Sequence, residues 1–202
     1  MSPSSVLDSS EFGYVSGDEV SRPRALISVA DKTGIVELAK SLGANGWEII
    51  ASGGTAKHLR EADVEVTSVS EITGFPEILD GRVKSTHPKI FGGILADRNS
   101  QDHLYELVQQ EIEPMEMVVC NFYPFEQMPS VEMIDIGGPA MVRAAAKNYE
   151  SVWVLVSPSD YASVLKAWES AGEDHSQMRR SLAHKAFEMT TAYDAAIAEW
   201  LG

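Results

Sequence analysis

The sequence predicts a single α/β domain in which a parallel β-sheet carries helices on both faces. Short apolar runs of strand length alternate along the chain with segments whose apolar residues recur at helical spacing, a pattern typical of such a sheet. The 202 residues, 44% of them apolar, are enough for one hydrophobic core. We expect the domain over residues 23–202, after a disordered Ser-rich and acidic tail over residues 1–22.

The first half of the chain supplies three expected strands and two expected helices. Arg24–Val29 is a short apolar run, and Ile35, Leu38, Ala39 and Leu42 after it share one helix face. The second strand ends at a Ser-Gly-Gly-Thr turn, and the third alternates apolar and polar residues. In chain order these elements are a strand at 24–29, a helix at 33–42, a strand at 47–51, a helix at 56–62 and a strand at 64–69.

The second half begins with a long connection, Glu71–Lys89, which is rich in glycine and proline and shows little periodicity. Such a connection inside a compact domain is usually functional or disordered. Met115–Asn121 is the strongest apolar run, and a Gly-Gly turn precedes the helix Gly138–Lys147. The elements after the connection are a helix at 102–110, a strand at 115–121, a helix at 138–147, a strand at 151–156, and helices at 158–171 and 178–201.

Composition excludes several classes of function. A formal net charge of -14 argues against non-specific nucleic-acid binding, and no apolar run of about 18 residues is present to span a membrane. The single cysteine, Cys120, cannot form an internal disulfide, so we expect a reducing compartment, the cytoplasm. Because Cys120 lies in an apolar run, a buried strand residue is favoured over a nucleophile. The five histidines lack metal-ligand spacing, so we expect no metal site.

In a parallel sheet, ligands bind at the carboxyl ends of the strands, so the loops there hold the candidate site residues. Ser52-Gly53-Gly54-Thr55 joins a strand to a helix, and its glycines would let backbone N–H groups at the helix N-terminus approach a phosphate. An ordinary helix cap with turn glycines explains the same residues equally well. The turn matches neither the Walker A loop nor the dinucleotide-binding fingerprint.

A second loop gathers positive charge in this acidic chain. Gly81–Pro88 (GRVKSTHP) contains Arg82, Lys84 and His87, and arginine and lysine are the residues that bind phosphate groups. Taken alone, a solvated basic loop is the simpler interpretation. Lys32, in the loop after the first strand, would add a positive charge at the same edge of the sheet, although its neighbour Asp31 is also a possible helix cap.

Two further segments contain candidate residues. Asn121 and Tyr123 end the strongest strand, where they could contact a heterocycle or simply form a packed aromatic turn. Arg143 and Lys147 share one face of an alanine-rich helix. A lysine partly buried there would have a lowered pKa suited to proton transfer, whereas a lysine that extends to solvent at the helix end is the alternative.

Together these motifs resemble a known family. In chain order they are Ser28–Gly34, Ser52–Thr55, Thr73–Glu77, Gly81–Pro88, Cys120–Phe125, Asp135–Gly138, Arg143–Asn148 and Leu182–Ile197. The chain, from about Arg24 to its end, is similar to the IMP cyclohydrolase domain, the N-terminal part of the bifunctional purine biosynthesis family that also contains a phosphoribosylaminoimidazolecarboxamide formyltransferase. The resemblance implies a methylglyoxal-synthase-like fold with a Rossmann-like parallel sheet.

The resemblance also implies a reaction, namely the dehydrative closure of formyl-AICAR (FAICAR) to IMP in de novo purine biosynthesis. It implies no metal and no cofactor, a homodimer, and no contact with nucleic acid or membranes. Formyl transfer to AICAR would require a separate transformylase or a part of the protein absent from these 202 residues.

The resemblance implies roles for individual residues. Lys147 would donate and accept protons, assisted by Lys84, Tyr123 and Asp135. The residues implied to bind the nucleotide are Ser28, Asp31, Lys32, Ser52, Gly53, Gly54, Thr55, Arg82, Val83, Lys84, Ser85, Cys120, Asn121, Asp135, Ile136 and Gly137.

Two departures from the family pattern occur. Ala30 stands where the family often has serine, which would remove one hydroxyl contact, and Ser85-Thr86 replaces the usual Thr-Leu before His87-Pro88. Two other functions remain open. One is methylglyoxal synthase, which fits the ordered motifs less well, and the other is a nucleotide-sensing regulatory module, which needs the phosphate site but not the proton-transfer residues.

Overall fold

The computed structural model describes residues 22–170 and 174–202, which form one five-stranded parallel sheet. The expected tail therefore lies outside the described residues, apart from Arg22. The strand order is β3-β2-β1-β4-β5, with every neighbouring pair parallel. The strands are β1 (Arg24–Val29), β2 (Glu48–Ala51), β3 (Thr67–Ser68), β4 (Met117–Asn121) and β5 (Trp153–Leu155).

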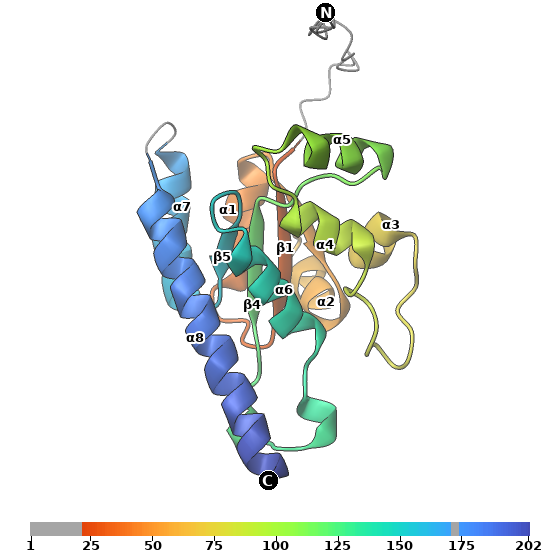
Figure 1. Cartoon of the computed structure of the whole chain (residues 1–202), viewed down its shortest axis with the longest axis vertical. Coiled ribbons are helices and arrows are strands. Elements are labelled where there is room, and N and C mark those ends of the chain that lie inside the picture. Colours follow the sequence, from red (N-terminus) through yellow and green to blue (C-terminus); the bar gives the residue numbers. More distant parts are fainter. Residues whose placement is uncertain (1–21, 171–173) are drawn as a thin grey trace, which may run out of the picture.

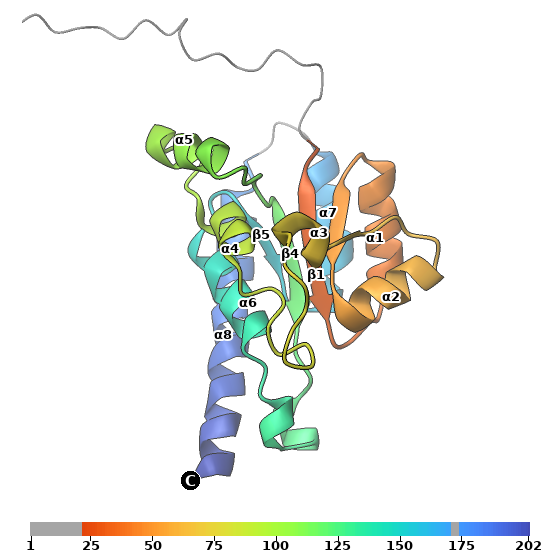
Figure 2. The same cartoon turned by 90° about the vertical axis from the view of Figure 1, so that its right-hand side faces the viewer.

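Helices cover both faces of the sheet, as the sequence predicts (Figures 1 and 2). One face carries α1 (Ile35–Ala44), α2 (Gly53–Glu61) and α7 (Tyr161–Glu169). The other carries α4 (Pro88–Leu95), α6 (Gly137–Lys147) and α8 (Ser176–Leu201). Two shorter helices, α3 (Val69–Thr73) and α5 (Gln101–Gln109), complete the set, together with 3₁₀ turns at Phe125–Gln127, Val131–Met133 and Pro158–Asp160.

The central strands form the core because both of their faces are covered. In β1 and β4 the residues Leu26, Ile27, Val118 and Val119 are at most 1% exposed. Burial on both faces explains why these strands read as continuous apolar runs rather than as alternating patterns. In the part of the chain that the structure describes, no helix is long and apolar enough to cross a membrane.

Two predicted segments differ from the structure. The expected third strand, 64–69, shrinks to Thr67–Ser68, because Ser68 and Glu71 form a reciprocal capping box that starts α3 at Val69. The expected irregular connection contains the end of α3 and the start of α4, where Pro88 occupies the first turn and the His87 ring accepts a hydrogen bond from the Lys89 N–H. A capping box and a proline after a cap were readable signals in the sequence.

The turn after β2 is fastened to β1 by Thr55. The Thr55 hydroxyl is buried, and it donates to the Val29 carbonyl and accepts from the Val29 N–H, at 3.1 Å each. The side chain that the family resemblance implies for nucleotide binding therefore has a structural role, and its backbone N–H remains for a ligand.

Replacing Thr55 with valine is expected to destabilise the fold while preserving its shape. The change removes both hydrogen bonds and leaves the buried Val29 N–H without its Thr55 acceptor, which costs about 1–3 kcal/mol. Urea unfolding measures the loss, with Thr191→Val on the exposed face of α8 as the matched control. Equal stability of the two variants would contradict this role for Thr55.

Candidate functional site

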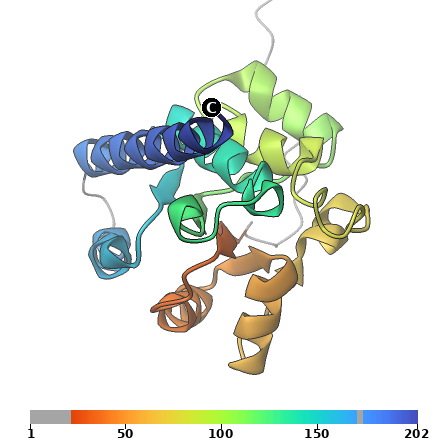
Figure 3. The same cartoon turned by 90° about the horizontal axis from the view of Figure 1, so that it is seen from below.

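The site is built around the carboxyl ends of β1 and β4, which Figure 3 views end-on. The chain leaves β1 towards β2 and leaves β4 towards β5, so the strand order reverses between these two neighbours. Parallel sheets bind ligands at such a switch point. Here the Asn121 side chain closes the gap, because its Oδ1 accepts from the Ala30 and Asp31 N–H groups at 2.8 Å each and its Nδ2 donates to the Asp31 carbonyl at 3.1 Å.

Asn121 therefore orders the β1–α1 loop rather than presenting a free amide to a ligand. In that loop the Asp31 carboxylate accepts from the Thr33 N–H at 2.9 Å, and hydrogen bonds from Thr33 hold the pKa of Asp31 below its ordinary value. Lys32 Nζ lies 3.3 Å from the Val29 carbonyl oxygen, so its charge is held against the end of β1.

The Ser52–Thr55 turn opens α2 as the sequence predicts. Ser52 is the N-cap residue in an extended conformation, and its side chain makes no capping hydrogen bond within the described residues. Gly53 follows with a φ of +53°, a left-handed conformation that favours glycine. The first N–H groups of α2 and the Ser52 hydroxyl are the polar groups available here for an anion.

Lys84 approaches this turn from the connection between α3 and α4. A Cβ placed on Gly53 would lie 3.3 Å from Lys84 Nζ, and one placed on Gly81 would lie 4.0 Å from the same atom. Gly81 also has a left-handed φ, +83°, in a small turn closed by an antiparallel bridge between Ile78 and Val83. Val83 thus shapes the turn, and the missing side chain of Gly53 leaves space for the Lys84 ammonium beside the α2 N-terminus, while Gly81 lies at contact distance from the same ammonium.

The N-terminus of α6 forms a second wall of the site. A Cβ on Gly137 would lie 2.8 Å from Ser85 Oγ, so the segment after Lys84 packs directly against this helix end. The Asp135 carboxylate accepts a hydrogen bond from the Gly138 N–H at 3.2 Å, while Ile136 is exposed beside it. Ser85, Asp135 and Gly137 therefore lie together at the N-terminus of α6.

Three other candidate residues have contacts or burial that the described structure defines. Arg82 is exposed and pairs with Glu132, so it ties two loops together. Cys120 is buried, which raises the pKa of its thiol and confirms the strand interpretation over the nucleophile. Ser28 is half-buried and lies beside Cys120 in the β1–β4 register.

Lys147 is not brought to this edge within one chain. It is the last residue of α6, which starts at the site and runs towards the opposite pole of the sheet (Figure 1). The ten residue steps from Gly137 correspond to about 15 Å along the helix axis. Lys147 is also exposed, in agreement with the alternative of a lysine that extends to solvent at the helix end. Tyr123, by contrast, follows β4 directly and is 57% exposed at the site edge.

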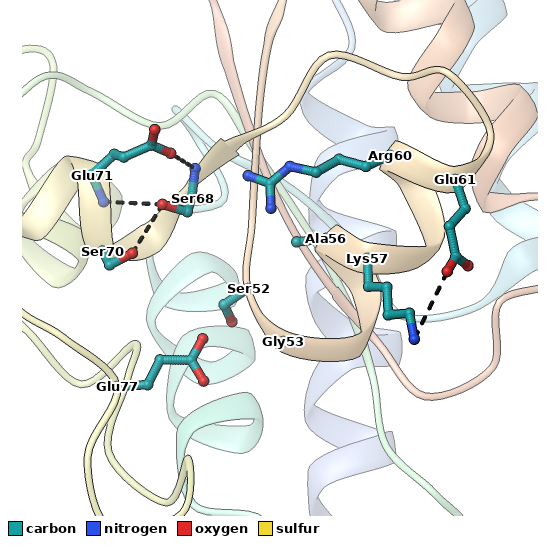
Figure 4. A pocket seen from close by; sticks show the side chains of 10 residues that line it. All are labelled: Ser52, Gly53, Ala56, Lys57, Arg60, Glu61, Ser68, Ser70, Glu71 and Glu77. Carbon is teal, nitrogen blue, oxygen red and sulfur yellow. Dashed lines mark hydrogen bonds and ion pairs between the residues drawn. The ribbon is translucent and has the colours of Figure 1, made fainter.

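A cleft of about 770 Å³ adjoins the turn (Figure 4). Ser52 and Gly53 contribute to it, and the Glu77 carboxylate faces them from the opposite wall. The other lining residues are Ala56, Lys57, Arg60, Glu61, Ser68, Ser70 and Glu71. Sequence reasoning missed Glu77 as a cleft residue, although it belongs to a quoted motif. Within residues 22–170 and 174–202, no group of three His, Cys, Asp or Glu side chains could hold a metal ion.

Comparison with known proteins identifies the family. The model of the MGS-like domain family matches residues 34–149, more than half of the chain. The chain belongs to this family. Residues 145–202 match a second family model, that of the AICARFT/IMPCHase bienzyme. The fold expected from the sequence, a methylglyoxal-synthase-like parallel sheet, is thereby confirmed.

Individual relatives agree with this assignment. The bifunctional purine biosynthesis proteins PurH of Acetivibrio thermocellus and Persephonella marina are 50% and 51% identical, over 88% of this chain and 36% of each relative. The chain thus spans about a third of the length of these relatives. A crystal structure of ForH is 38% identical with a TM-score of 0.82, and the match covers 90% of this chain and 100% of that one.

Alanine at Gly53 is expected to destabilise the protein by about 1–2 kcal/mol, the cost of a left-handed conformation for a residue with a Cβ. The Cβ would also press on Lys84 Nζ. Gly54→Ala is the matched control, because a Cβ there meets nothing within 4 Å and alanine favours the helix. Urea unfolding of both variants is the measurement, and equal free energies of unfolding would refute the proposed packing.

Proposed function

We propose that the protein is an IMP cyclohydrolase that converts FAICAR to IMP and water. The observation that carries the proposal is the placement of Lys84 beside the α2 N-terminus, in a chain about 50% identical to bifunctional purine biosynthesis proteins. A phosphate would bind the N–H groups of Gly53, Gly54 and Thr55 and the Lys84 ammonium, because a helix N-terminus and a cation both attract anions.

The reaction needs a held substrate and proton transfer, and no electrons leave the substrate. The carboxamide nitrogen attacks the formamido carbonyl carbon and a C–N bond forms. The carbonyl oxygen leaves as water after receiving two protons, which the carboxamide and formamido nitrogens give up. We assign the stabilisation of this oxygen and the movement of these protons to Lys84 and Asp135, with Tyr123 at the rim.

Two other functions deserve comparison. A methylglyoxal synthase or a nucleotide-sensing module would use the same fold and a similar phosphate turn. The match of residues 145–202 to the bienzyme model supports the cyclohydrolase, because it covers the last helix, outside the MGS-like match. We further propose that the protein acts in the cytoplasm as a homodimer, and that a separate transformylase, or a longer form of the chain, supplies FAICAR.

The purified protein is expected to form IMP from FAICAR without added metal or nucleotide cofactor, because ring closure is a dehydration that calls only for binding and proton transfer. Absorbance spectroscopy and chromatography of the product measure the conversion, with dihydroxyacetone phosphate as the comparison substrate. If the protein forms methylglyoxal from dihydroxyacetone phosphate and no IMP from FAICAR, it is a methylglyoxal synthase and this proposal is wrong. Activity lost in EDTA and restored by a divalent ion would show a metal requirement.

Lys84→Met is expected to lower kcat about 10²–10⁴-fold, the usual contribution of a positioned proton-transfer group. The long apolar chain preserves the packing between Gly53 and Gly81 while removing the charge. The Lys147→Ala variant tests whether the second lysine also contributes to turnover. If Lys147 also takes part, a second copy must supply it, and a mixture of the two inactive variants will regain activity. Full activity of the Lys84→Met variant would remove Lys84 from the reaction.

A further inference from the structure

The C-terminal half of α8 is linked to the loop before α6 through one hydroxyl group. Tyr193 is 7% exposed, and its Oη accepts a hydrogen bond from the Asp135 N–H at 2.8 Å. The same hydroxyl donates to the Met133 carbonyl at 2.9 Å. It therefore bridges two backbone groups that lie two residues apart in the loop.

Asp135 is consequently held from two sides. Its backbone N–H is bound by Tyr193 of α8, while its carboxylate accepts from the Gly138 N–H of α6. The carboxylate cannot turn on this short loop without breaking one of these contacts. Burial raises the pKa of Tyr193, so the hydroxyl stays protonated and able to donate.

The ring of Tyr193 makes separate contacts that do not involve Asp135. Its centroid lies 5.0 Å from that of Phe122 and 6.3 Å from that of Phe125, and Phe125 also packs against Trp200 at 5.5 Å. These aromatic contacts attach α8 to the segment after β4. Only the hydroxyl reaches the backbone of residues 133–135, so the role of the ring and that of the hydroxyl can be separated by substitution.

We propose that Tyr193 is a positioning residue for the ring closure and acts through Asp135. The inference rests on the proposed function, since it concerns the orientation of a carboxylate that moves protons there. It makes α8 part of the reaction machinery, although Tyr193 lies outside the MGS-like match at residues 34–149 and inside the bienzyme match at residues 145–202. In an MGS-like domain without the Tyr193 hydroxyl, fewer contacts would hold the loop before α6.

The test compares Tyr193→Phe, Asp135→Asn and the double variant with the wild-type protein. Tyr193→Phe is expected to lower kcat about tenfold, as the loss of two hydrogen bonds implies, with KM for FAICAR changed less than about twofold. In the Asp135→Asn background the same change is expected to cause no further loss, because residues that act through one another are non-additive. Trp200→Phe, which keeps an aromatic ring and lacks the loop contact, is the matched control and should retain the wild-type kcat.

Hydrogen exchange of the peptide containing residues 133–138 gives a readout independent of catalysis, and faster exchange of the Asp135 amide is expected in Tyr193→Phe but not in Trp200→Phe. An unchanged kcat in Tyr193→Phe, or a loss that multiplies fully with that of Asp135→Asn, would overturn the inference while leaving the cyclohydrolase proposal intact. If the wild-type protein fails to convert FAICAR, the proposed function is overturned, and with it the catalytic role of Tyr193. The exchange difference between Tyr193→Phe and the wild-type protein would then show only that the hydroxyl holds the loop.

Discussion

One asparagine side chain holds the two central strands together at the point where the sheet reverses its order. At a switch point the chain departs in opposite directions from neighbouring strands, so the backbone groups just beyond their ends lose their ladder partners. The Asn121 side chain binds the backbone of Ala30 and Asp31 there, accepting two hydrogen bonds and donating one, and the Ala30 N–H also donates to the Asn121 carbonyl at 3.3 Å. The loop that starts α1 is thereby fixed, and the Tyr161 ring packs within 3.6 Å of the Cβ position of Gly34 below it.

The site beside Asn121 depends on glycines, which have no side chain. Gly53 and Gly81 belong to different segments of the chain, yet both lie beside the same ammonium group, and the missing side chain of Gly53 leaves room for it. Their left-handed φ values make glycine the favoured residue on conformational grounds as well. The glycine at position 53 thus serves both the left-handed backbone of the turn and the close approach of the cation. In a protein with a net charge of -14, this local arrangement of positive charge is what would attract a phosphate.

Much of this could be predicted from the sequence, and the rest has identifiable reasons for being missed. The alternation of apolar runs and helical spacing predicted the parallel sheet, and β1 has the expected bounds. The role of Asn121 could not be predicted, because an amide at a strand end suits a ligand and a backbone clamp equally well. Thr55 was ambiguous for the same reason, since a hydroxyl in a turn has many partners within reach. Tyr193 falls in the last predicted helix, and the sequence could not indicate the role of its hydroxyl, because that role depends on the Asp135 loop lying beside the helix.

The direction of α6 gives the two lysines of the candidate site different physical settings. The helix starts at the site, so the positive end of its dipole points there, next to Ser85 and Asp135. Its negative end carries Lys147, where a cation stabilises the helix whatever the protein does. The presence of Lys147 is therefore explained without catalysis, whereas the packing of Lys84 between two left-handed glycines is not needed to cap or stabilise any helix. A charge that stabilises no helix, placed beside the first N–H groups of α2, is better explained by a ligand than by the fold.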